Sequence, residues 1–250
     1  MMSNSSHKNR SPFFAVISIV LLFGLGSISP LSAYEIAPVE QGGELFGTIR
    51  YDGKPPSRSG FQVSNDQDYC GSIVENESFQ VNPENYALQN AVVSIENIKK
   101  GKKPLNSTVV IKSRNCRFVP HVQAAMEGDS YELRNADIVL HIAHLHLGET
   151  TLFNVAMPPN GSNIRKPLLQ AGIISIKCDA HTFMQGWLVV FNNPYFAVSD
   201  QDGKFSITDI PAGKYRVTIW HEGLPVKEKE VTISQDKKTI LSMDMTTDGK

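Results

Sequence analysis

Residues 173–191 read Ile-Ile-Ser-Ile-Lys-Cys-Asp-Ala-His-Thr-Phe-Met-Gln-Gly-Trp-Leu-Val-Val-Phe. The two ends of this stretch are rich in Ile and Val, which favours two β-strands joined by a short loop. The loop carries a thiol at Cys178, an imidazole at His181 and a thioether at Met184. Three side chains that bind soft metal ions therefore stand close together in the sequence, and the strands at either end would hold them in place.

The rest of the chain also consists of short runs rich in Val, Ile, Phe and Thr. Turn signals such as Asp52-Gly53, Lys100-Gly101 and Asp202-Gly203 separate these runs, and no stretch after the N-terminal region shows sustained helical spacing. This pattern predicts an all-β fold, either a sandwich or a barrel. The expected strands cover residues 44–51, 91–96, 108–113, 130–135, 138–144, 173–177, 187–191, 204–207, 214–220 and 229–234.

The composition of the 250 residues excludes several classes of protein. Hydrophobic residues make up 41% and charged residues 20%, which is too apolar for a disordered chain. The formal net charge is −1, so no basic excess points to nucleic acid as a partner. Only one long apolar run occurs, near the N-terminus, which excludes a protein with several membrane spans.

The N-terminus has the three-part pattern of a secretory signal peptide. Lys8 and Arg10 form a basic opening, residues 13–26 are almost purely apolar, and a small polar stretch ends at Ala33. We expect cleavage after Ala33 and no membrane span afterwards, which places the mature chain in the periplasm or outside the cell. The alternative is an uncleaved anchor, although the apolar run is short for a span of about 20 residues.

The chain has three cysteines, and an odd number leaves one thiol outside any intrachain pair. Cys178 has metal-binding neighbours, whereas Cys70 and Cys116 have none. We therefore expect a disulfide between Cys70 and Cys116, with Cys178 kept free for a metal. The alternative is that Cys178 is a buried, inert thiol, as many cysteines are.

Further imidazoles lie upstream of the loop, at His141, His144 and His146. Two imidazoles, one thiolate and a weak axial thioether describe a mononuclear copper site, because sulfur suits Cu(I) and imidazole suits both oxidation states. His141 would supply the second imidazole from the strand expected over 138–144. Zinc is the main alternative: it prefers four strong ligands, and His144 or His146 could replace Met184. A third interpretation is that all of these are ordinary core or surface residues.

Residues 178–191 resemble the ligand loop of the cupredoxins, the blue copper proteins, and the Cys-x-x-His-x-x-Met spacing is most similar to that of the amicyanins. The upstream residues that fit the same family are, in order, Cys116, Phe118, Pro120, Gly128, Asn135, His141 and His144. The resemblance covers residues 108–191. It implies a Greek-key sandwich or barrel that binds one copper ion through His141, Cys178, His181 and Met184.

One position departs from the cupredoxin pattern. Members of that family usually carry Asn directly after the first histidine, where it ties the two ligand loops together, and this chain has Ile142. Because such hydrogen bonds tune a metal site, we expect the change to alter the reduction potential and to loosen the loop.

Four further residues are candidates for accessory metal ligands. His144 lies an odd number of positions after His141, so its side chain should point to the opposite face of the strand unless a bulge intervenes. We expect packing or solvated roles for all four, which are His121, His144, His146 and Met157.

The segments on either side resemble a second family, the carboxypeptidase regulatory-like (transthyretin-type) β-sandwiches. The hallmark of that family is an Asp-x-Asp-Gly-x-Phe turn followed by Pro-x-Gly-x-Tyr, which this chain has at residues 200–205 and 211–215. Residues 47–55 and 90–93 are similar to its opening strands.

These resemblances predict a division of the chain into four parts. A signal peptide covers 1–33, N-terminal strands of the sandwich cover 34–100, a copper domain covers 101–191, and the rest of the sandwich covers 192–250. Insertion of one domain into an exposed loop of another is tolerated. The alternative is two tandem domains, with the N-terminal strands belonging to the copper domain.

Taken together, the resemblances imply an exported electron-transfer protein with one copper ion, and not an enzyme. The partners they imply are redox proteins such as c-type cytochromes or periplasmic dehydrogenases. His181 would be the electron outlet, and Phe183, Pro158 and Pro159 would form an apolar rim for transient docking. Two alternatives stay open: an envelope protein that binds or delivers copper without a redox role, and a structural β-sandwich with a decayed site.

Overall fold

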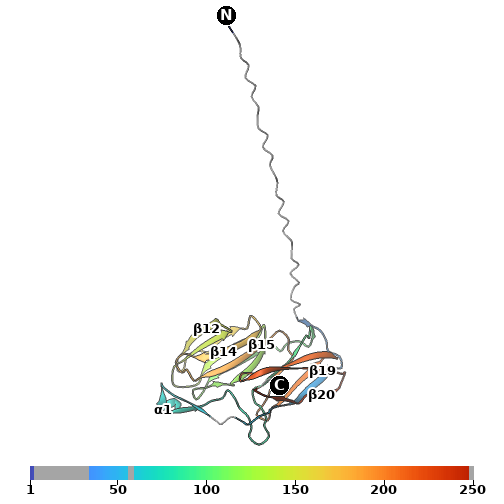
Figure 1. The fold of residues 1–250 in the computed structure, drawn as a ribbon. Coiled ribbons are helices and arrows are strands. Elements are labelled where there is room, and N and C mark those ends of the chain that lie inside the picture. The colour runs from blue at the N-terminus through green and yellow to red at the C-terminus, as the bar shows by residue number, and fades with distance from the viewer. Residues whose placement is uncertain (3–33, 56–58, 248–250) are drawn as a thin grey trace. The chain divides into compact units, whose positions relative to one another are not determined.

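Almost every regular element of the chain is a strand (Figure 1). The computed structural model describes residues 1, 2, 34–55 and 59–247, and in this part the prediction of an all-β fold is confirmed. The predicted signal peptide and its cleavage site lie outside the described residues, apart from Met1 and Met2. No helix of the described part has the length and apolar character needed to cross a bilayer.

Residues 108–191 form two sheets that share one hydrophobic core. Side chains alternate between the core and the opposite face along each strand, as the period of two in a β-strand requires. The four-stranded sheet has the order β13-β10-β7-β8, and the five-stranded sheet has the order β12-β11-β14-β15-β9; β12, β14 and β15 lie together in Figure 1. The strands are β7 (Thr108–Ser113), β8 (Phe118–Val119), β9 (Val122–Met126), β10 (Ser130–Asn135), β11 (His141–Leu147), β12 (Thr150–Met157), β13 (Ile164–Pro167), β14 (Gly172–Cys178) and β15 (Gln185–Phe191).

A second pair of sheets is built from both ends of the described chain. One has the order β16-β5-β18-β19 and the other β17-β2-β20, with β21 also paired to β2. Their core draws on residues 45–98 and 195–245. The strands are β2 (Gly43–Tyr51), β5 (Val92–Glu96), β16 (Phe196–Val198), β17 (Lys204–Ile210), β18 (Gly213–His221), β19 (Leu224–Ile233), β20 (Lys238–Ile240) and β21 (Met243–Met245).

The two cores lie within one compact unit, Ala33–Lys250. The predicted boundaries at 100/101 and 191/192 separate the fully buried residues of the two cores, but Tyr69 and Cys70, from the predicted N-terminal part of the sandwich, pack against the core of residues 111–190. Whether the parts are separate domains stays a prediction, because a third buried cluster of Val92, Val122 and Val189 draws residues from both.

A buried carboxylate also joins the two pairs of sheets. Glu222, in the turn between β18 and β19, has a side chain that is 3% exposed. It accepts a hydrogen bond from Trp187 Nε1 at 2.7 Å, is bonded to the imidazole of His121, and lies 3.4 Å from Gln185 Nε2. Since a buried charge is tolerated only when it is paired, these contacts fix the turn against β15.

The remaining short elements lie at the edges. β1 (Glu35–Ile36) pairs in parallel with β6 (Lys100–Gly101). β3 (Gly60–Gln62) and β4 (Ile73–Glu75) form an antiparallel pair, and the single helix of the described residues, α1 (Gln67–Cys70), lies in the connection between them.

The pH dependence of folding should carry a contribution from His221, the last residue of β18. Burial lowers the pKa of His221 from its ordinary value of 6.5 to about 4. As the pH falls from 6.5 towards 4, the unfolded chain therefore binds a proton that the folded chain does not, and the free energy of unfolding decreases. The loss amounts to roughly 3 kcal/mol across this window.

The variant His221→Asn tests this contribution. Asn cannot titrate, yet it keeps an acceptor for the Gly223 N–H, which bonds to His221 Nδ1 at 3.2 Å. Urea denaturation between pH 7 and pH 4 should show that the wild type loses more stability than the variant. Parallel stability curves for the two proteins would contradict the assignment.

Candidate metal centre

The loop between β14 and β15 is closed by its own backbone. The Cys178 N–H donates to the Met184 carbonyl at 3.3 Å, and the Met184 N–H donates to the His181 carbonyl at 2.9 Å. Cys178, His181 and Met184 are each at most 2% exposed. Because the backbone bonds fix the turn, the three side chains are held in place from within the loop.

The structure brings His141 to this loop from the first residue of β11. Cys178 Sγ lies 3.9 Å from His141 Nδ1 and 3.8 Å from His181 Nδ1, and the two Nδ1 atoms lie 3.2 Å apart. A triangle with these sides has a circumradius of about 2.1 Å, so one point lies at that distance from all three atoms, within the range of metal–nitrogen and metal–sulfur bonds of about 2.0–2.3 Å. The three donors thus fit a trigonal metal ion.

Both imidazoles are bound to a carboxylate through their other nitrogen. His141 Nε2 lies 2.9 Å from an oxygen of Asp137, and His181 Nε2 lies 2.9 Å from an oxygen of Asp66. A carboxylate accepts hydrogen bonds, so the proton of each neutral ring resides on Nε2 and the Nδ1 lone pair faces the centre. Two such lone pairs repel each other, and a metal ion between them removes the repulsion.

Asp137 is the polar anchor of the site. Burial would raise the pKa of Asp137, but hydrogen bonds from the Cys116 N–H, the Tyr69 hydroxyl, the Asn115 N–H and the His141 ring together lower it. These bonds measure 3.0, 2.8, 2.7 and 2.9 Å. Asp137 therefore stays ionised and holds the His141 ring by a charged hydrogen bond.

Burial also sets the protonation states of two of the three metal donors, His141 and Cys178. Burial lowers the pKa of His141, which keeps this imidazole neutral and able to bind a metal. Burial also raises the pKa of the Cys178 thiol, so the free protein holds a thiol there rather than a thiolate. Metal binding must then release one proton from Cys178.

The main chain of Ile142 contacts the ligand loop, and the expected effects of this residue on the loop and on the reduction potential stay predictions. The Ile142 N–H donates to Cys178 Sγ at 3.4 Å, and the Asp179 N–H donates to the Ile142 carbonyl at 3.1 Å. The main chain of Ile142 thus ties the two ligand segments together without an amide side chain. In addition, the Asn135 side chain donates to the carbonyls of Val139 and Met157.

Two methionines lie near the donors. Met184 belongs to the same buried cluster as Cys178 and both are 2% exposed. Met157 pairs directly with His141 across β11 and β12, and residues paired in this way project from the same face of a sheet. Both thioethers therefore belong to the environment of the centre.

The other histidines lie away from the three donors. His144 and His146 project from the opposite face of β11, with ring centroids 3.8 Å apart and ring planes tilted by 36°. His144 is also bonded to Asp179 and Thr151. His121 is buried against Glu222, at the junction described above. His141 and His144 thus project from opposite faces of β11, as the odd spacing between them predicts.

Cys70 and Cys116 form a disulfide, which is the pairing expected from the sequence, and Cys178 is free and buried. The disulfide places Cys70 beside the centre, with its Sγ 4.0 Å from His181 Nε2.

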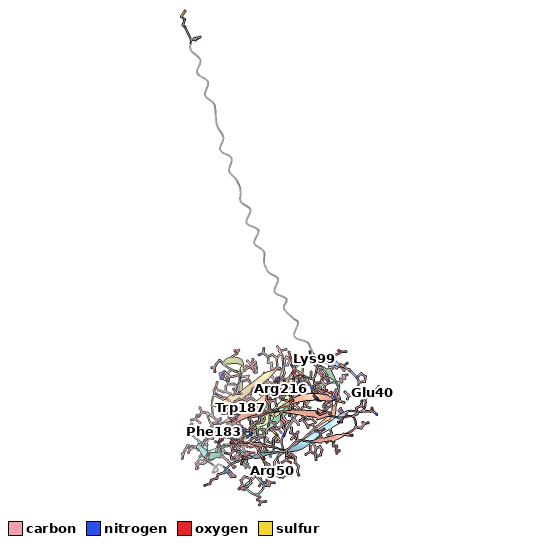
Figure 2. The ribbon with its side chains drawn as sticks, turned by 45° about the vertical axis from the view of Figure 1, so that its right-hand side comes forward. Glu40, Arg50, Lys99, Phe183, Trp187 and Arg216 are labelled. Carbon is pink, nitrogen blue, oxygen red and sulfur yellow. A yellow bond between two sulfur atoms is a disulfide. The ribbon has the colours of Figure 1, made fainter. Side chains whose placement is uncertain are left out.

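His181, the expected electron outlet, is buried in the structure, and its role as the outlet stays a prediction. It is 1% exposed, and an oxygen of Asp66 and the Sγ of Cys70 lie 2.9 Å and 4.0 Å from its Nε2. Of the expected apolar rim, Phe183 is partly buried, and its ring centroid lies 5.7 Å from that of His181 (Figure 2).

Sequence reasoning missed three carboxylates: Asp137, Asp66 and Glu222. The sequence could have indicated Asp137, because it lies only four residues before its partner His141. The sequence could not have indicated the other two carboxylates. Asp66 lies 115 residues from its partner His181, and Glu222 lies 101 residues from its partner His121.

Comparison with known proteins gives one family match and several similar structures. The model of polysaccharide lyase family 4, domain II, matches residues 181–241. This family differs from the carboxypeptidase regulatory-like one, whose resemblance stays a prediction. No curated protein matches the chain.

Three of the similar structures each match 34% of the chain. Amicyanin from Paracoccus versutus is 18% identical with a TM-score of 0.31 over 81% of its own chain, and a purple cupredoxin from Nitrosopumilus maritimus is 18% identical with a TM-score of 0.30 over 99%. A copper-containing nitrite reductase from Thermus scotoductus SA-01 is 21% identical with a TM-score of 0.31, and the match spans 22% of its length.

The anchoring role of Asp137 predicts the effect of Asp137→Asn. An amide accepts fewer hydrogen bonds and presents its NH₂ group to other donors, so the variant should lose about 2–4 kcal/mol of unfolding free energy. Its affinity for Cu(II) should fall by about 10–100-fold. Urea denaturation and titration against a competing chelator measure the two effects.

Asp179→Asn is the matched control for this prediction. Asp179 follows Cys178 directly, but its side chain is 43% exposed and contacts His144 on the outer face. We expect changes below about 1 kcal/mol for this variant. Equal effects of the two substitutions would show that Asp137 has no special role.

Proposed function

We propose that this protein binds one copper ion and transfers electrons. His141, Cys178 and His181 would hold the metal, and the thioether of Met184 would supply a fourth, weaker donor. The observation that carries the proposal is the buried triangle of one sulfur and two Nδ1 atoms, which has a common point about 2.1 Å from each.

The donor set favours copper over zinc. A structural zinc site prefers four strong ligands, whereas among the described residues only three such donors, from His141, Cys178 and His181, lie together around the centre. The fourth candidate is a methionine, whose soft sulfur suits copper and binds zinc poorly.

The rigidity of the site favours electron transfer. Bound copper would supply a one-electron couple. The loop bonds of Met184, the carboxylates on both imidazoles and the Ile142 amide on the Cys178 sulfur hold the donors in position before any metal arrives. A site with the same geometry in both oxidation states needs little rearrangement when an electron enters or leaves.

The other candidate functions have less support. An enzyme needs an open position for substrate at the metal, and a copper-delivery protein needs an accessible donor. In this chain the three strong donors are each at most 2% exposed. The protein would therefore be an electron carrier rather than an enzyme.

The disulfide supports the proposed location, periplasmic or secreted, because disulfides persist in oxidising compartments. Partners such as c-type cytochromes or periplasmic dehydrogenases follow from the sequence resemblance alone.

Loading the purified protein with Cu(II) tests the proposal. We expect one copper per chain, an intense visible absorption band from the copper–thiolate bond, and a reversible one-electron wave in voltammetry. Cys178→Ser should abolish the band, while His144→Gln, on the outer face of β11, should leave the stoichiometry and the band unchanged. A colourless copper complex, or several copper ions per chain, would contradict the proposal.

A further inference from the structure

The β3–α1–β4 segment is attached beside the metal centre at four residues, which all lie between positions 65 and 70. We call residues 60–75 the cap. The Asn65 side chain donates to the Ala180 carbonyl at 3.1 Å, within the ligand loop. The other three anchors are Asp66, which contacts the His181 ring, Tyr69, which contacts Asp137, and Cys70, which is bonded to Cys116.

Asp66 makes the contact closest to the metal position. Its Oδ2 accepts a hydrogen bond from His181 Nε2 at 2.9 Å, which leaves the Nδ1 of that ring directed at Cys178 and His141. Asp66 adopts φ 56° and ψ 35°, a left-handed conformation that Asp, Asn and Gly tolerate better than other residues. This turn of the backbone brings the carboxylate to the ring just before α1 begins.

Tyr69 and Cys70 attach the cap to the opposite side of the centre. The Tyr69 hydroxyl donates to Asp137 Oδ1 at 2.8 Å, and Asp137 holds the His141 ring. Cys70 is joined covalently to Cys116, whose N–H donates to the other oxygen of Asp137. The cap therefore supplies the carboxylate that binds the His181 ring, and it contacts the carboxylate that binds the His141 ring.

We propose that Asp66 is a positioning residue for His181, and that the cap around it closes the metal centre to solvent and to docking at the imidazole edge. This inference rests on the proposed function for the part that concerns copper. It assigns the fixed orientation of His181 to a residue outside the two sheets that supply the metal ligands.

The closure has a consequence for electron transfer and for metal exchange. A partner cannot contact the His181 ring without displacing the cap, and neither can water, a small anion or a chelator. Release of copper then requires the cap to open, and the disulfide limits that opening at α1. The Asp66 side chain is 45% exposed, so its substitution disturbs no core.

The variants Asp66→Gly and Asp66→Asn distinguish the effect of losing the hydrogen bond from the effect of changing the left-handed backbone conformation. Glycine keeps the left-handed conformation and removes the acceptor, whereas Asn keeps both the conformation and an oxygen acceptor. Asp68→Gly is the matched control: it removes an exposed carboxylate and loosens the same helical turn.

The metal-free protein gives the first readout. Cys178 is the only free thiol of the chain, so its alkylation by N-ethylmaleimide reports access to the centre. We expect Asp66→Gly to speed alkylation by about tenfold or more over the wild type, with Asp68→Gly and Asp66→Asn within a few-fold of it. Equal rates for Asp66→Gly and Asp68→Gly would overturn the closure.

The copper-loaded protein gives the second readout. Asp66→Gly should change the paramagnetic resonance spectrum of the Cu(II) form and should speed removal of Cu(I) by a chelator by about tenfold, and Asp66→Asn should restore most of both. An Asp66→Asn variant that behaves like Asp66→Gly would overturn the role of the hydrogen bond. If the wild type took up no copper, the proposed function would fail, while the alkylation rates would still decide whether the cap closes the centre.

Discussion

The hydrogen bond between His141 Nε2 and Asp137 is the constraint on which the centre depends. It leaves the Nδ1 lone pair of His141 facing Cys178 and His181, and it buries a charge that the fold must compensate. Two backbone N–H groups, at Asn115 and Cys116, provide that compensation from the connection between β7 and β8. The Asp137 carboxylate therefore fixes the orientation of the His141 imidazole. It also accepts hydrogen bonds from the N–H of the disulfide-bonded Cys116 and from the Tyr69 hydroxyl of the cap.

The two sheets around the centre explain why the donors are ready for a metal. β11 and β14 are neighbours, so His141 and Cys178 come from adjacent strands of a sheet whose register is fixed by its own ladder. The loop after β14 then returns to β15 within six residues, closed by backbone bonds that involve both Cys178 and Met184. Rigidity follows from strand pairing and loop closure, and the cap adds the exclusion of solvent.

Much of this could be predicted from local sequence pattern. The strands at 173–177 and 187–191 extend by only one or two residues in the structure, and the three donors His141, Cys178 and His181 do lie together. The expected strand at 138–144 instead begins at His141, because Asp137 turns inward to its amide donors and leaves Ile138 73% exposed. Asp66 could not be found in this way, since it reaches His181 from a segment 115 residues away that carries no strand or metal pattern.

X-ray absorption at the copper edge, on the copper-loaded wild-type protein, tests the central claim most directly. The account predicts that the metal is bound by one sulfur atom at short distance and by two imidazole nitrogens, with the sulfur signal lost in Cys178→Ser. A copper ion surrounded only by nitrogen and oxygen, or a sulfur signal unchanged in Cys178→Ser, would contradict it.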